Sequence, residues 1–103
     1  MGFFSNLFGS AAPKQDLAEL IQKGAFLVDV RSPGEFASGS AKGAVNIPLD
    51  KIPANLERFK NKENIIVFCR SGNRSGQALS ILKQNGFTNV YNGGTVDDIK
   101  SAQ

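Results

Sequence analysis

The sequence contains no histidine, and it contains only one cysteine. Without histidine the chain cannot build a Ser-His-Asp triad or a Cys-His pair, and most types of zinc site are excluded. A single cysteine can form neither an internal disulfide nor a Cys-x-x-Cys redox pair. Any cysteine chemistry must therefore depend on a lone thiol, and the sequence gives no reason to expect a metal or a cofactor.

Long apolar runs and concentrated charge are also missing. No apolar stretch approaches the roughly 20 residues of a membrane-spanning helix, and a chain without disulfides is typical of a cytoplasmic protein. The 12 Lys and Arg against 9 Asp and Glu give a net charge of +3, and the basic residues form no long run. We therefore expect no nucleic-acid partner and no transmembrane segment, whereas a small anionic substrate suits the mild positive charge.

The length of 103 residues predicts one domain. We interpret residues 1–13 as an apolar N-terminal stub with a linker, and residues 14–103 as the domain. In the stub, Phe3, Phe4, Leu7 and Phe8 fall on one side of a helix. This pattern predicts a flap docked on the domain's own surface, and the alternative is a weak membrane or partner contact.

Short apolar runs alternate with helical periodicity along the rest of the chain. Residues 25–30 are nearly all apolar, as in strands buried on both faces of a parallel sheet. The patterns predict strands over 25–30, 43–47, 64–68 and 88–91, and helices over 16–23, 34–39, 52–60, 75–85 and 96–100. Gly93 and Gly94 predict a turn, and Gly86 predicts a left-handed helix cap. We expect an α/β fold with a four- to five-stranded parallel sheet and helices on both faces.

The lone thiol lies where a strand gives way to a loop and then to a helix. Cys69 is followed by Arg70, Ser71, Gly72, Asn73, Arg74 and Ser75. A short loop containing glycine can point successive N–H groups inward as an anion-binding nest, and the next helix adds its positive end. These groups and the two arginines favour the thiolate, so we expect a lowered thiol pKa. Cys69 is the candidate nucleophile and residues 70–75 the candidate anion-binding loop. The alternative is a small buried apolar residue.

Asp29 and Arg31 end the first apolar strand, so they are expected at the same sheet edge as Cys69. We interpret both as supporting residues in a structural ion pair, with Glu35 as the expected partner of Arg31. A contact between Arg31 and the substrate is the alternative.

Three segments, in order, resemble those of the single-domain rhodaneses, a thiosulfate sulfurtransferase-like family. They are the Asp-x-Arg and Glu-Phe pattern in residues 27–36, Gly-Ala-x-Asn-Ile-Pro in residues 43–48, and Cys-x-x-Gly-x-Arg in residues 69–74. Residues 90–94 are similar to the family's closing segment. Ser40 and Thr95 stand where many members have histidine and tryptophan, and neither position is catalytic in the family. The resemblance covers nearly everything from Asp16 onward and implies the rhodanese-like fold.

The resemblance also implies a ping-pong sulfurtransferase. Cys69 would take a sulfane sulfur from thiosulfate or a similar anionic donor as a persulfide, and loop amides with Arg70 and Arg74 would hold the anion. With no second cysteine, the acceptor must be external: cyanide, a thiol or a protein. One alternative is a non-catalytic binding module of the same fold. Another is a cysteine phosphatase or arsenate reductase, although four residues separate Cys69 from Arg74 where the phosphatase signature has five.

Overall fold

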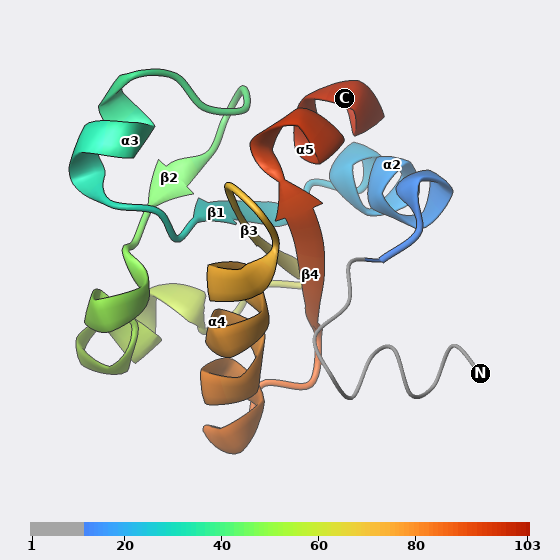
Figure 1. Ribbon diagram of the computed structural model, residues 1–103. Helices are drawn as coiled ribbons and strands as arrows, with labels where there is room; N and C mark the ends of the chain where they lie inside the picture. Colours follow the sequence, from blue (N-terminus) through green and yellow to red (C-terminus); the bar gives the residue numbers. More distant parts are fainter. Residues whose placement is uncertain (1–11) are drawn as a thin grey trace.

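A parallel sheet of four strands lies between two layers of helices in the computed structural model, which describes residues 12–103 (Figure 1). The strands are β1 (Phe26–Asp29), β2 (Val45–Asn46), β3 (Ile65–Cys69) and β4 (Val90–Thr95), and their order is β2-β1-β3-β4. The α-helices are α2 (Lys14–Gln22), α3 (Pro33–Ala37), α4 (Asn73–Gln84) and α5 (Val96–Ala102), and the 3₁₀ segments are η1 (Leu49–Lys51) and η2 (Pro53–Phe59). The predicted α/β architecture is confirmed.

Strand β3 is buried along its whole length because both faces of the sheet are covered. Ile65, Val67 and Cys69 belong to the apolar cluster shared with α4, whereas Ile66 and Phe68 belong to the cluster shared with α2 and α5. Figure 1 shows α2 and α5 next to each other, and α4 apart from them. Since side chains alternate along a strand, Cys69 faces the α4 side of the sheet.

Strand β4 is longer than predicted, because Gly93 and Gly94 continue it instead of forming a turn. The register with β3 shifts at this point, so that Gly93 is the extra residue of a β-bulge. A Cβ atom at Gly93 would lie 2.6 Å from Cγ2 of Ile66 and 2.6 Å from Cδ1 of Ile99. The predicted turn is therefore wrong, because both glycines lie within β4. Gly93 is required for close packing inside the sheet.

Two further predicted elements differ in detail. The segment predicted as one helix over 52–60 is the 3₁₀ segment η2, interrupted at Asn55, whose φ of −126° is not helical. Helix α4 begins at Asn73, two residues earlier than predicted, so its positive end lies closer to Cys69. Gly86 follows α4 with a φ of +91°, which confirms the predicted left-handed cap.

The described chain begins beside strand β4. The backbone N–H of Ala12 donates a 2.8 Å hydrogen bond to the carbonyl oxygen of Asn92. Phe3, Phe4, Leu7 and Phe8 lie outside the described residues, so their docking stays a prediction, as does the division of the chain at residue 13. Over residues 12–103, none of the helices is both long enough and apolar enough to cross a membrane.

Candidate functional site

The thiol lies at the junction between β3 and α4, as the sequence predicts. Strand β3 ends at Cys69, and α4 begins at Asn73 after only three residues. Gly72 makes this short connection possible with a φ of +89°, a left-handed conformation that other residues rarely adopt. The loop therefore folds back over the carboxyl end of β3.

Polar hydrogens of the loop and of α4 surround the sulfur atom. The Gly72 N–H donates a hydrogen bond to Cys69 Sγ at 3.0 Å, and the Ser75 N–H donates another at 3.4 Å. The Ser75 hydroxyl oxygen also lies 3.4 Å from Sγ. Cys69 is fully buried. A buried apolar cysteine would not need the two backbone N–H donors, and these donors favour a negative charge on the sulfur.

The pKa of the Cys69 thiol lies below its ordinary value as a result of opposing effects. Burial raises the pKa, because an apolar environment disfavours the charged form. The hydrogen bond from the Ser75 side chain lowers it, and so do the backbone N–H groups of Ser75, Ser71 and Gly72. Together these donors outweigh the effect of burial.

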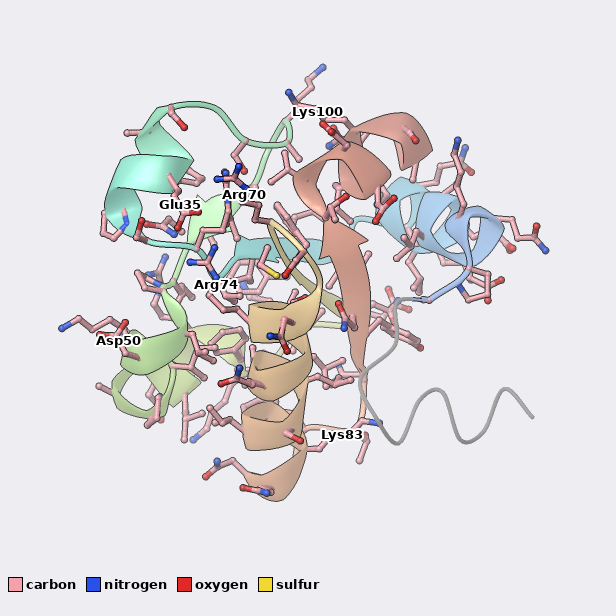
Figure 2. The ribbon with its side chains drawn as sticks, viewed as in Figure 1. Glu35, Asp50, Arg70, Arg74, Lys83 and Lys100 are labelled. Atoms are coloured by element: carbon pink, nitrogen blue, oxygen red, sulfur yellow. The ribbon has the colours of Figure 1, made fainter. Side chains whose placement is uncertain are left out.

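Arg74 connects the loop to helix α3. Its Nη1 lies 2.8 Å from Oε1 of Glu35, and its Nη2 lies 3.0 Å from Oε2, so the pair is bidentate. Figure 2 shows the two side chains turned toward each other. The hydrogen bond from Arg74, followed by the backbone and side-chain hydrogen bonds of Ser32, lowers the pKa of Glu35 to about 2. Arg74 thus braces α4 against α3.

Arg70 lies on the surface of the same loop. Its side chain is exposed, and it makes no ion pair with any residue from 12 to 103. Figure 2 shows Arg70 on the same side of the molecule as Glu35 and Arg74. Among the residues that the structure describes, Arg70 is therefore the loop cation without an ion-pair partner, whereas the charge of Arg74 is shared with Glu35.

Ser71 and Asn73 shape the outer part of the loop. The N–H of Asn73 donates to the Ser71 hydroxyl at 3.4 Å, and both residues are exposed. Only the backbone of Ser71 acts on the sulfur, through its effect on the thiol pKa. The side chains of these two loop residues therefore do not contact Sγ.

Asp29 and Arg31 form a buried ion pair with each other. Nε of Arg31 lies 3.0 Å from both carboxylate oxygens of Asp29, and Nη2 lies 2.7 Å from Oδ2. Nη2 also donates to the carbonyl oxygen of Gly39, and the Ser40 hydroxyl donates to the Asp29 carboxylate. The expected pair of Arg31 with Glu35 is wrong, because the buried carboxylate two residues back holds the guanidinium. This geometry supports a structural role for both residues.

Asn92 on β4 is a site residue that the sequence did not point to. Its Oδ1 accepts hydrogen bonds from the Ser75 hydroxyl at 2.7 Å and from the Gly94 N–H at 2.9 Å. Its Nδ2 donates to the carbonyl oxygen of Gly72 at 3.2 Å. A usable signal was its spacing, since Asn92 lies two positions after the buried Val90 and so shares its inward-facing side of the strand.

The described residues place no three side chains of metal-binding type together. This holds for Cys69 and for all aspartate and glutamate positions from 12 to 103. The site is therefore described by the thiol, its hydrogen-bond donors and the two loop arginines.

Known proteins share both the sequence and the fold. The sequence profile of the family described as Rhodanese-like domain matches residues 13–97. A protein of Allochromatium vinosum named sulfurtransferase is 38% identical over 66 residues, which are 64% of this chain and 62% of that protein. The thiosulfate sulfurtransferase PspE of Escherichia coli is 36% identical over 74 residues, which are 70% of this chain and 71% of that protein.

A solved structure described as rhodanese with anions from E. coli superposes with a TM-score of 0.67 and 35% identity. The superposition covers 74% of this chain and 92% of that structure. The chain spans less than two thirds of the length of the Allochromatium protein.

Proposed function

Because the chain belongs to the rhodanese-like domain family, we propose that it is a sulfurtransferase that works through a persulfide on Cys69. The observation that carries the proposal is the set of donors around a buried thiol, led by the 3.0 Å contact from the Gly72 N–H to Sγ. A thiolate held in this way is a nucleophile that needs no general base. The names of the Allochromatium and E. coli relatives support the same reaction class.

The first half-reaction loads the sulfur. The Cys69 thiolate attacks the outer sulfur of thiosulfate or a similar sulfane donor, and a new S–S bond forms. The bond between the outer sulfur and the sulfonate sulfur breaks, and its electron pair leaves with sulfite. The negative charge then resides on the outer sulfur of the persulfide. Arg70, exposed on the loop, attracts the anionic donor, and the loop N–H groups and the amino end of α4 stabilise the bound charge.

The second half-reaction unloads the sulfur. Cyanide or a thiolate attacks the outer sulfur of the persulfide, the S–S bond breaks, and its electron pair returns to Cys69 Sγ. The sequence contains no other cysteine, so the acceptor lies outside these 103 residues. A small molecule or a thiol of a partner protein meets this requirement.

The geometry favours sulfur transfer over the two alternatives. A non-catalytic binding module has no need for a lowered thiol pKa, which this site has. A cysteine phosphatase needs an arginine that faces the bound phosphoryl group, whereas Arg74 is held by Glu35 on α3. Turnover of an aryl phosphate that depends on Cys69 would favour the phosphatase instead.

The direct test follows the sulfur by mass spectrometry and by thiosulfate:cyanide turnover. Incubation with thiosulfate should add the mass of one sulfur atom at Cys69, and cyanide should remove it. Cys69→Ser should gain no mass and show no turnover, whereas Ser80→Ala, exposed on α4, should behave as wild type. A wild-type thiol that can be alkylated but never takes sulfur from any sulfane donor would refute the proposal.

A further inference from the structure

The side-chain amide of Asn92 ties strand β4 to both the loop and helix α4. Its oxygen faces two donors, the Ser75 hydroxyl and the Gly94 N–H, and its nitrogen faces the Gly72 carbonyl. A backbone N–H can only donate and a backbone carbonyl can only accept, so this amide has one possible orientation. Asn92 is 2% exposed and Ser75 is 0% exposed, which leaves little room for water to replace either partner.

This orientation determines which group accepts the hydrogen bond of the Ser75 hydroxyl. A serine hydroxyl has one proton, and the Asn92 oxygen can only accept it. At an oxygen–oxygen distance of 2.7 Å the proton lies on the line to Asn92. Ser75 Oγ then offers a lone pair to Cys69 Sγ at 3.4 Å, which suits a protonated thiol.

A thiolate requires the opposite arrangement. Once the thiol has lost its proton to solvent, a Ser75 lone pair would face a negative sulfur, which is unfavourable. Rotation about the Cβ–Oγ bond turns the hydroxyl hydrogen toward Sγ, while the Asn92 oxygen still accepts the hydrogen bond from the Gly94 N–H. The hydroxyl oxygen does not need to move, because it is already within reach of both partners.

We propose that Asn92 is a positioning residue that holds the Ser75 hydroxyl between two settings. The hydroxyl hydrogen stays bonded to Ser75 Oγ in both settings. It points to the Asn92 oxygen when Sγ carries a hydrogen or a sulfane sulfur, and it points to Sγ when Cys69 is a thiolate. The part that concerns the sulfane sulfur rests on the proposed function. The switch would stabilise the attacking thiolate and then withdraw its hydrogen bond once the charge has moved to the outer sulfur.

A double-mutant cycle tests whether Asn92 acts through Ser75. The four proteins are wild type, Asn92→Leu, Ser75→Ala and the double variant, and the measurement is the pH dependence of iodoacetamide alkylation of Cys69. Leucine has a similar branched shape but cannot accept a hydrogen bond, so the Ser75 hydroxyl donates to Sγ throughout. The factor by which Asn92→Leu changes the thiolate fraction should therefore be about threefold larger with Ser75 present than in the Ser75→Ala background.

An equal change in the two backgrounds would mean that Asn92 only shapes the loop, and it would overturn the inference. Should Asn92→Leu fail to fold, Asn92→Asp takes its place in the cycle. Aspartate keeps both accepting contacts and binds the hydroxyl proton more strongly. Its direct effect on the thiol is present in both backgrounds and cancels. The expected coupling then has the opposite sign, and its absence would again overturn the inference.

A matched control separates the site from general effects of losing a buried amide. Asn89 also donates through its side chain to backbone carbonyls, those of Lys62 and Glu63, but it precedes the opposite end of β4. Asn89→Leu should leave the thiolate fraction unchanged, and a change like that of Asn92→Leu would count against the inference. Alkylation needs no sulfur donor, so the cycle gives its answer even if the protein fails to take up sulfur.

Discussion

Replacement of Gly72 by alanine tests whether the backbone of the loop stabilises the Cys69 thiolate. Gly72 has a φ of +89°, and a Cβ atom there would lie 3.7 Å from the nearest atom, the Cα of Gly94. Alanine therefore meets no clash, and its penalty is purely conformational. The left-handed conformation costs an L-residue roughly 1–2 kcal/mol.

The two ionisation states should respond differently to this strain. In the thiol state the Gly72 N–H contacts a neutral sulfur, so the bond is weak and the alanine loop relaxes. In the thiolate state a hydrogen bond to a charged group contributes about 1.5–3 kcal/mol, which at the middle of both ranges exceeds the strain and restores the left-handed turn. The strain then opposes ionisation. The thiol pKa rises, and the thiolate fraction below that pKa falls by about five- to thirtyfold, since roughly 1.4 kcal/mol corresponds to a factor of ten.

The assay is the pH dependence of alkylation together with urea unfolding. Gly86→Ala is the matched control, because Gly86 has a φ of +91° and follows the far end of α4, and a Cβ atom there would meet no atom of residues 12–103 within 4 Å. It should lose about 1–2 kcal/mol of stability and keep the wild-type thiolate fraction. A folded Gly72→Ala protein with an unchanged thiolate fraction would refute the reasoning, because the strain of the left-handed turn would then not depend on the charge of the sulfur.

Two further predictions concern the ion pairs near the site. Asp29→Asn leaves the guanidinium of Arg31 buried without its carboxylate, so urea unfolding should show a loss of about 3–5 kcal/mol, and a loss below about 1 kcal/mol would contradict this. Glu35 has a pKa lowered from 4.5 to about 2, so the stability from its pair with Arg74 is present above pH 4.5 and is lost as the pH falls through 2. The stability difference between wild type and Glu35→Gln should therefore shrink between pH 5 and 2, and a difference that stays constant over this range would contradict the assignment.

The location of the site could be predicted because it depends on neighbours in sequence. The apolar run that precedes Cys69 predicts a buried strand over 64–68, and the structure ends β3 one residue later, at Cys69. Gly72 predicts a tight loop, and it does adopt the left-handed conformation. Both signals act over a few residues, so local patterning was sufficient.

The glycines of β4 show where local patterning fails. Two adjacent glycines are typical of a turn, but Gly93 is a glycine because Ile66 and Ile99 leave no space for a side chain. That crowding comes from a neighbouring strand and from a helix that follows. No window of sequence around Gly93 contains this information.

The sequence alone was therefore sufficient to predict the candidate nucleophile and the N–H groups that surround it, because spacing along the chain places these backbone groups within a few ångströms of the thiol. The tertiary structure alone decided the side-chain partners. Arg74 meets Glu35 across 39 positions and Ser75 meets Asn92 across 17, which gives the loop its brace and its hydroxyl acceptor. The physical reason is that a side-chain hydrogen bond needs an approach of about 3 Å, and between distant residues this is set by how strands and helices pack.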